Sequence, residues 1–235
     1  MKYTIRAMWY MVKAYFASKW MLFKSRKMAQ DERRMYVYQF LRRWCPGLFK
    51  ACGTRVIYHG LENMPDQGGV LYVGNHQSIF DIIAMLSIME FPTAFVNKKE
   101  LDHVFFLGAL MRGIDCVSID REDLRQSLSA IKTASERLKE GMNMVIFPEG
   151  TRSKNGQMGE FKKGSIRAAT NIGGKIVPFR ITSEIRDILE NNKGLHIIPQ
   201  EVHVYIGKPI DTGAMTRQEQ KDLAEEIPQI VAALS

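Results

Sequence analysis

The sequence predicts an α/β fold: a single domain whose central, mostly β-sheet core is flanked by helices, preceded by a segment of two amphipathic helices. A length of 235 residues suits one large domain. From Gly53 onward, short β-branched runs alternate with helical stretches, which is typical of a layered α/β core. Charge divides the chain, because residues 1–55 carry 13 basic and two acidic side chains, net +11, whereas the other 180 carry 20 basic and 23 acidic ones, net −3. We expect a helical segment over residues 1–50 and the α/β domain over residues 51–235.

The first two helices are expected over residues 3–23 and roughly 30–44, with Pro46-Gly47 ending the second. Bulky apolar side chains such as Trp9 and Phe16 alternate there with Lys13 and other basic residues. A basic segment binds either nucleic acid or an anionic lipid surface. The mixture of aromatic, Met and basic residues at helical spacing favours a helix lying in a membrane interface. The alternative is a helical hairpin that packs on the body.

The rest of the chain alternates between the two element types. Strands are expected at Thr54–Tyr58, Val70–Gly74, Thr93–Val96, Cys116–Ile119, Asn143–Phe147, Lys175–Ile181 and Val202–Ile206. Helices are expected at Ile79–Met89, Leu101–Met111, Leu124–Glu140, Ser165–Asn171 and Arg217–Ala233. In such folds chemistry gathers at the ends of strands, where the next loop begins.

Cysteine use and hydropathy bear on the compartment. The three cysteines, Cys45, Cys52 and Cys116, form neither an even disulfide framework nor a metal-ligand spacing, so we expect reduced thiols and no metal. No signal-peptide pattern is present, and no uninterrupted apolar run reaches the ~18 residues that suggest a transmembrane helix. We therefore expect a peripheral or monotopic protein on the cytoplasmic face of a membrane.

The first motif that carries chemistry is Gly74-Asn75-His76-Gln77-Ser78-Ile79-Phe80-Asp81, directly after the expected strand Val70–Gly74. His76 and Asp81 lie five residues apart across a strand-to-helix turn. That spacing can bring the carboxylate to one imidazole nitrogen and leave the other to accept a proton. Since no Ser or Cys nucleophile precedes His76, the attacking hydroxyl is expected to come from the substrate.

The second motif is Phe147-Pro148-Glu149-Gly150-Thr151-Arg152-Ser153, which again follows an apolar strand. Pro148 and Gly150 predict a tight turn that exposes backbone N–H groups. Arg152 can make bidentate bonds to a phosphate. Glu149 is expected either to order this turn or to bind a substrate hydroxyl.

Together the two motifs resemble the glycerolipid acyltransferase superfamily, and within it the 1-acyl-sn-glycerol-3-phosphate acyltransferases, over roughly residues 55–210. Weaker matches are Lys98-Lys99-Glu100-Leu101, Ile119-Asp120-Arg121, Phe161-Lys162-Lys163-Gly164 and Ile176-Val177-Pro178. The family commonly has a glycine where Asp115 stands. The resemblance implies that His76 is a general base and Asp81 its orienting acid. It places Glu149, Gly150, Thr151 and Arg152 in the acceptor-binding block and makes Lys98, Arg121 and Lys162 candidates for the phosphate or the donor headgroup.

The expected reaction is transfer of a fatty acyl group from a thioester to the sn-2 hydroxyl of 1-acyl-sn-glycerol-3-phosphate, giving phosphatidic acid. The expected partners are an anionic membrane surface, the lysophospholipid, and acyl-CoA or acyl-acyl carrier protein as co-substrate, with no further cofactor. Another lysolipid or glycerol 3-phosphate could be the acceptor instead. Outside this class, the basic segment could make the chain a membrane adaptor or a nucleic-acid-binding module. Because no helix-turn-helix, RNP-like or zinc-finger signature is present, we expect no nucleic acid.

Overall fold

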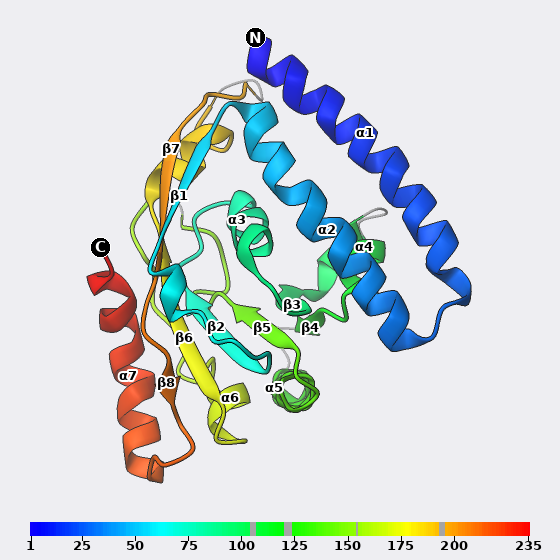
Figure 1. The fold of residues 1–235 in the computed structure, drawn as a ribbon. Coiled ribbons are helices and arrows are strands. Elements are labelled where there is room, and N and C mark those ends of the chain that lie inside the picture. The colour runs from blue at the N-terminus through cyan, green and yellow to red at the C-terminus, as the bar shows by residue number, and fades with distance from the viewer. Residues whose placement is uncertain (104–106, 120–123, 154, 193–195) are drawn as a thin grey trace.

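The computed structural model describes residues 1–103, 107–119, 124–153, 155–192 and 196–235. It confirms the predicted fold class: one sheet flanked by helices, preceded by two long N-terminal helices (Figure 1). The helices are α1 Lys2–Lys24, α2 Gln30–Cys52, α3 Phe80–Ile88, α4 Leu107–Gly113, α5 Leu124–Lys139, α6 Arg167–Thr170 and α7 Arg217–Ala233, with short 3-10 helices η1 Ser25–Lys27, η2 Leu61–Asn63, η3 Lys99–His103 and η4 Ser183–Ile188. The strands are β1 Arg55–His59, β2 Val70–Gly74, β3 Thr93–Lys98, β4 Val117–Ile119, β5 Asn143–Ile146, β6 Lys175–Ile181, β7 Glu201–Ile206 and β8 Ile210–Asp211.

The sheet runs in the order β1-β7-β6-β2-β5-β3-β4, with β8 paired to β6. Strands β6, β2, β5, β3 and β4 are mutually parallel, whereas β7 and β8 run antiparallel to β6. β2 lies in the interior of the sheet, between β6 and β5, and all five of its residues are buried. The carboxyl ends of β2, β5 and β3 therefore meet at one edge of the sheet, where both sequence motifs begin.

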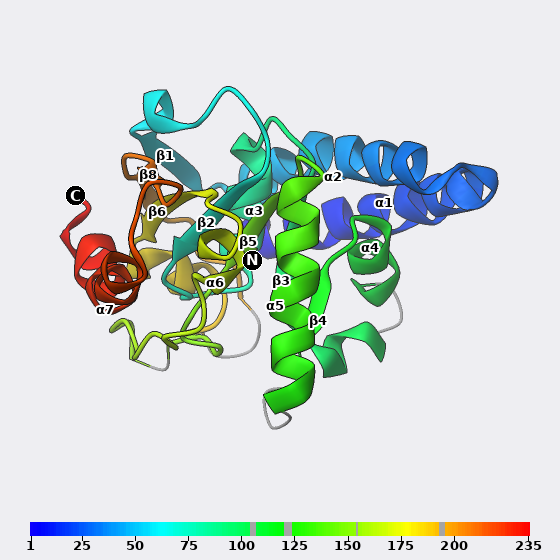
Figure 2. The same ribbon diagram turned by 90° about the horizontal axis from the view of Figure 1, so that it is seen from below.

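The two faces of the sheet are covered by different helices, as Figures 1 and 2 show. On β2, Val70 and Tyr72 pack into a core shared with α2 and α3. Leu71 and Val73 point the other way, into a core shared with α5, α6 and α7. This alternation is the period of two expected for a strand that is buried on both faces.

Helix α2 does not end at Pro46-Gly47, as predicted, but continues to Cys52. A proline inside a helix removes one backbone hydrogen bond at a cost of about 3 kcal/mol. Leu48, Phe49 and Cys52 beyond it are buried in the core, and each fully buried apolar side chain contributes ~1.5–3 kcal/mol. Burial therefore outweighs the proline. The helix ends at Gly53, whose left-handed φ of 71° suits glycine.

The N-terminal helices pack on the body through α2. Tyr38 is almost fully buried and donates a hydrogen bond of 2.6 Å to the carbonyl of Met89. Arg34 Nε lies 2.6 Å from Asp115 Oδ2. Asp115 has φ 54°, a conformation that glycine adopts most easily, and its side chain is held there by the ion pair with Arg34. The expected boundary after residue 50 lies inside α2, two residues before its end.

Helix α1 packs on α2 with a face of small, tyrosine and methionine side chains. Ala7, Ser18 and Met21 are buried there, and Tyr10 donates a 2.6 Å hydrogen bond to the carbonyl of Trp44. The opposite face of α1 is exposed. Over its whole length, α1 exposes the large apolar residues Ile5, Met8, Trp9, Met11, Val12, Phe16, Trp20 and Phe23. Among the described residues, no helix is both long and apolar enough to cross a bilayer.

Two further element predictions differ from the structure. The helix expected over Leu101–Met111 is divided, because η3 occupies its start, α4 begins at Leu107, and residues 104–106 lie outside the described residues. In η3, Asp102 Oδ1 accepts hydrogen bonds from Ser118 Oγ at 2.7 Å and Asn97 Nδ2 at 3.2 Å, which tie this segment to β3 and β4. The short strand β8 had no predicted counterpart.

Candidate active site

The loop after β2 is fixed at its first residue. The side-chain amide of Asn75 accepts from the backbone N–H of Ile181 and donates to the carbonyl of the same residue, both at 2.8 Å. A side-chain amide that reproduces a strand pairing in this way extends the sheet by one step beyond Gly74. The next residue, His76, is thereby held at the carboxyl edge of the sheet.

His76 and Asp81 are in direct contact, as their spacing predicts. Nδ1 of His76 lies 2.7 Å from Oδ2 of Asp81. The same oxygen accepts from the backbone N–H groups of Gln77 at 2.6 Å and Ser78 at 2.9 Å. Since a carboxylate oxygen with these neighbours accepts, Nδ1 carries the proton and Nε2 is the nitrogen left to accept one. Full burial raises the pKa of Asp81 above its ordinary value, although hydrogen bonds from His76 and the backbone act in the opposite direction.

The imidazole ring of His76 is also held by packing. It stacks on the ring of Phe147, with centroids 4.2 Å apart and an interplanar angle of 16°. Phe147 belongs to the second motif and is itself buried. The rotamer of His76 is therefore constrained by Asp81 on one atom and by Phe147 on one face.

The second motif forms the tight turn that its sequence predicts. The N–H of Gly150 donates to the carbonyl of Phe147 at 3.0 Å, and Gly150 has φ 73°. Glu149 orders this turn, since Oε1 accepts from the N–H of His76 at 2.7 Å and Oε2 accepts from the N–H of Gly159 at 2.8 Å. Partial burial raises the pKa of Glu149 above its ordinary value.

Three links join the two motifs into one unit. The N–H of His76 donates to Glu149, the N–H of Ser153 donates to the carbonyl of His76 at 2.8 Å, and Phe147 stacks on the imidazole. The parallel pairing of β2 with β5 brings the two motifs together. Val73 is opposite Ile146, and His76 and Glu149 each lie three residues beyond this pair. His76 and Glu149 thus reach the same level.

A cavity of about 290 Å³ lies against this unit. Its lining residues are Gln77, Thr151, Arg152, Ser153, Arg186 and Glu190. Arg152 is half-exposed, and its Nη1 lies 3.4 Å from Oε1 of Glu190. Two guanidinium groups beside one small cavity can bind an anionic ligand such as a phosphate.

Of the three remaining predicted residues, the structure describes Lys98 and Lys162, and neither lines this cavity. Lys98 ends β3 at the same edge of the sheet, half-exposed, with Nζ 2.8 Å from Glu100 Oε1. Lys162 is exposed, and its backbone N–H donates to the carbonyl of Pro148 at 3.2 Å. Arg121 lies outside the described residues.

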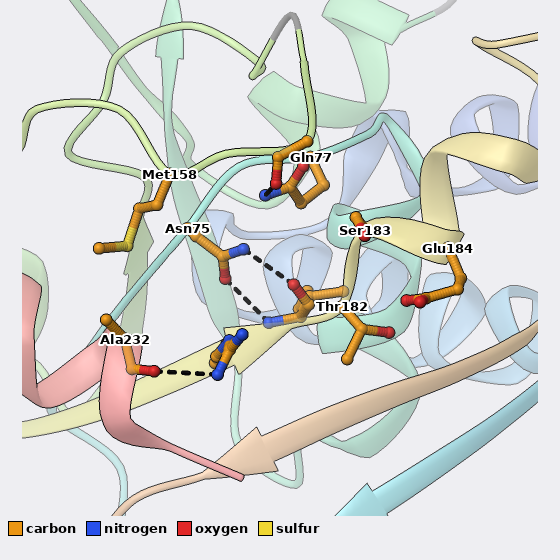
Figure 3. A pocket seen from close by; sticks show the side chains of 10 residues that line it. Asn75, Gln77, Met158, Thr182, Ser183, Glu184 and Ala232 are labelled. Atoms are coloured by element: carbon orange, nitrogen blue, oxygen red, sulfur yellow. Dashed lines mark hydrogen bonds between the residues drawn. The ribbon is translucent and has the colours of Figure 1, made fainter.

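A second cavity, of about 220 Å³, lies beside the loop that follows β2 (Figure 3). Asn75, Gln77, Thr182 and Ser183 line it, and Arg180 beside them donates to the carbonyl of Ala232 at 2.9 Å. Gln77 contributes to both cavities.

Sequence reasoning did not single out Gln77 as a site residue, nor Arg186 or Glu190. Gln77 lies within the first motif, so its position beside His76 was a usable signal. Arg186 and Glu190 come from η4 and the loop after it, which reach the site only through the packing of distant elements.

The chain is similar to known acyltransferases in sequence and in fold. The family model described as Acyltransferase matches residues 55–182, more than half of the chain. A chloroplastic 1-acyl-sn-glycerol-3-phosphate acyltransferase of Arabidopsis thaliana is 34% identical over 157 residues, which are 66% of this chain and 44% of that protein. The chain thus spans less than half the length of that relative. The 1-acyl-sn-glycerol-3-phosphate acyltransferase of Borreliella burgdorferi is 28% identical over 186 residues, covering 77% of this chain and 72% of that protein.

A solved structure is similar over nearly the whole fold. The 1-acyl-sn-glycerophosphate acyltransferase of Thermotoga maritima superposes with a TM-score of 0.79 at 26% sequence identity, covering 98% of this chain and 93% of the other. The superposition includes the N-terminal helices, which lie outside the family match. The matched segment contains β2, β5 and both motifs with the His76–Asp81 pair, so the resemblance noted from the motifs is confirmed: this chain belongs to the acyltransferase family.

Proposed function

We propose that the chain transfers a fatty acyl group from an acyl thioester to the sn-2 hydroxyl of 1-acyl-sn-glycerol-3-phosphate, with phosphatidic acid as product. The observation that carries the proposal is the His76–Asp81 pair, bound to the Glu149–Arg152 turn beside an arginine-lined cavity. The printed names of the relatives in Arabidopsis thaliana and Borreliella burgdorferi support the choice of acceptor.

In the proposed mechanism His76 is the general base. Nε2 takes the proton of the glycerol hydroxyl while that oxygen attacks the thioester carbonyl. The tetrahedral intermediate then expels the thiolate, which receives the proton back from the imidazolium. A positioned base contributes ~10²–10⁴-fold to such a step. Asp81, 2.7 Å from Nδ1, holds the tautomer and stabilises the imidazolium.

The oxyanion that develops on the thioester carbonyl needs hydrogen-bond donors at the same edge of the sheet as His76. The turn at Glu149–Thr151 supplies backbone N–H groups, but that of Gly150 already binds the carbonyl of Phe147 at 3.0 Å. The N–H groups of Glu149 and Thr151 are therefore our candidates for the oxyanion hole.

The acceptor's phosphate is proposed to bind Arg152. Its guanidinium is half-exposed at the cavity, so it can turn to a ligand without unfolding the turn. Arg186, which lines the same cavity, adds a second positive charge. The donor is acyl-CoA or acyl-acyl carrier protein, and a basic edge suits either of these anionic carriers. The remaining predicted cations, Lys98, Arg121 and Lys162, are kept as candidates for the donor headgroup.

We further propose that the N-terminal helices dock the enzyme on the cytoplasmic face of an anionic membrane. The exposed residues Ile5, Trp9, Val12, Phe16, Trp20 and Phe23 recur at helical spacing and form one stripe along α1. Basic side chains flank the stripe, with Lys24 Nζ 5.1 Å from the centre of the Trp20 ring. Aromatic residues beside basic ones are typical of interfacial helices, and each basic residue near an anionic surface adds about 1 kcal/mol.

Docking through α1 would bring the site to its lipid substrate. The ring of Phe49 on α2 packs 5.8 Å from that of Phe80 on α3, the helix that begins just after the His76 loop. Extracting a lysolipid into water would cost ~0.8 kcal/mol per CH₂. An active site held at the interface avoids that cost.

One assay tests the reaction. The purified full chain is incubated with each acyl donor in turn and with lysophosphatidic acid, lysophosphatidylcholine or glycerol 3-phosphate. We expect phosphatidic acid, detected by mass spectrometry, with one of the donors, and about 10³-fold less product from His76→Ala under the same conditions. Preferred acylation of lysophosphatidylcholine would contradict the assignment of a phosphate monoester as acceptor. Product from glycerol 3-phosphate alone would make glycerol 3-phosphate the acceptor in place of the lysolipid.

A further inference from the structure

Glu190 lies between the start of α3 and the Glu149–Arg152 turn. Its Oε1 accepts from the hydroxyl of Ser78 at 2.7 Å and from the backbone N–H of Ile79 at 3.0 Å. Nη1 of Arg152 lies 3.4 Å from the same oxygen. Three donors from two distant segments therefore meet on one carboxylate oxygen, at the wall of the arginine-lined cavity.

These donors are of the kinds that phosphate oxygens prefer in proteins: a hydroxyl, a backbone N–H at a helix start, and a guanidinium. A carboxylate has two oxygens to offer such a set, whereas a phosphate monoester has three. The second oxygen of Glu190, Oε2, is buried and accepts no hydrogen bond from the described part of the chain. The Glu190 carboxylate thus stands where a phosphate could bind the same donors, and only one of its two oxygens takes part.

We propose that Glu190 is an internal anion that competes with the acceptor's phosphate for Arg152 and thereby sets how tightly the site binds any phosphate. The inference rests on the proposed function, which assigns Arg152 to that phosphate. Glu190 keeps inorganic phosphate and small phosphate esters from occupying the site. A phosphate carried by a membrane-bound lysolipid displaces the carboxylate from Arg152 and takes its place.

The contact distances suit a displaceable partner. Charge-assisted N–H···O bonds are about 2.7–2.9 Å long, so the 3.4 Å contact to Arg152 is the weak one of the three. Arg152 is half-exposed, and it can turn from the carboxylate to a ligand. The two shorter hydrogen bonds, donated by Ser78 and Ile79, hold the Glu190 carboxylate at the start of α3 when Arg152 turns to the ligand.

The competition acts on occupancy. Every phosphate meets the same opposing charge, so the ratio of affinities between two phosphates is unchanged. All affinities fall together, however, and a dissolved phosphate then leaves the site mostly empty. The lysolipid still binds, because its acyl chain adds apolar binding and the membrane concentrates it near the site.

The experiment is a calorimetric titration of the full chain with inorganic phosphate. Glu190→Gln keeps the size of the side chain and an oxygen for Ser78 and Ile79 but removes the charge, so phosphate should bind about fivefold more tightly than to the wild type. Glu62→Gln is the matched control, because it removes the same charge from η2, at the opposite edge of the sheet from His76, and should bind phosphate as the wild type does. In Glu190→Gln with Arg152→Ala, the gain should disappear.

Glu190→Asp withdraws the carboxylate from Arg152 by one methylene and carries the test if Glu190→Gln does not fold. Phosphate binding that is unchanged or weaker in both variants would overturn the inference, since Glu190 would then be an aid to binding or a purely structural residue. Acyl transfer to lysophosphatidic acid is measured separately. Tighter phosphate binding without acyl transfer would retain the anion site and reject the proposed function. Acyl transfer with unchanged phosphate binding would retain the proposed function and reject the inference about Glu190.

Discussion

The His76 loop and the outer face of α1 differ in where their partners lie. In the loop, His76, Asp81 and Glu149 are held by hydrogen bonds and stacking within the molecule. On the outer face of α1, Trp9 and Phe16 are 61% and 66% exposed. The first arrangement fixes a geometry for chemistry, and the second offers apolar surface to something outside the chain. Changes in the loop should therefore affect every substrate, and changes on α1 only substrates held in a membrane.

The largest effect is expected from His76→Ala, which should lower kcat by about 10³-fold on both a dissolved short-chain lysolipid and a vesicle-bound one. The physical reason is loss of the base. Asp81→Asn should cost less, about 10²-fold, because it removes orientation and charge while the imidazole remains. Steady-state kinetics on both substrate forms, with circular dichroism as the folding control, measure this. A His76→Ala enzyme within tenfold of wild type would remove the base assignment.

The comparison predicts the opposite selectivity for α1. Trp9→Ser with Phe16→Ser should lower binding to phosphatidylglycerol vesicles by about 10²-fold or more, since each residue loses ~1.5–3 kcal/mol of apolar contact. Turnover of a dissolved short-chain lysolipid should stay at the wild-type level. Leu128→Ser on α5, also an exposed apolar residue, is the matched control and should bind vesicles normally. Vesicle sedimentation over a salt series gives the binding; equal loss with Leu128→Ser would contradict a specific role of α1.

A smaller effect, confined to one substrate, is expected from Arg152→Lys. Lys keeps the charge but lacks the planar fork, so the KM for the acceptor should rise by about five- to tenfold. The KM for the donor should stay unchanged. Initial-rate kinetics with each substrate varied in turn separate the two. A rise confined to the donor KM would move Arg152 to the thioester side of the site.

The smallest effect concerns Glu149 and pH. Burial raises its pKa above the ordinary value of 4.5, so in the window just above 4.5 the folded protein binds this proton and the unfolded chain does not. The contribution of Glu149 to stability must then fall as pH rises through that window. Thermal unfolding of wild type and Glu149→Gln between pH 4 and 7 tests this, since the wild-type Tm relative to the variant should decline as pH rises. A relative Tm that increases with pH would mean that the hydrogen bonds from His76 and Gly159 outweigh the cost of burial.

How much of this could be predicted depended on the range of the interactions. β2, β6 and α7 begin and end at the predicted residues. Apolar runs mark the two strands, and Thr216 caps the first turn of α7 together with Glu219. The continuation of α2 through Pro46 could not be predicted, since it depends on the burial of Leu48 and Phe49 against elements far along the chain.

The same distinction holds within the site. The contact between His76 and Asp81 follows from their spacing, since both belong to one local turn. The bond from the N–H of His76 to Glu149 depends on β2 pairing with β5, which no local pattern reveals. The position of Glu190 beside Ser78 joins residues 112 apart in sequence. Local motifs therefore indicated the chemical groups, and the sheet order decided which of them meet.

The hydrogen bond from the N–H of Ile197 to the hydroxyl of Thr4, 3.0 Å long, joins residues 193 apart in sequence. On the ribosome, at roughly 5–20 residues per second, about 10–40 s separate the synthesis of these two residues. During that interval α1 is made while the strands that complete the sheet do not yet exist. Under the proposed docking through α1, the aromatic stripe is available to a bilayer before the body has folded, so the order of synthesis favours assembly at the membrane surface.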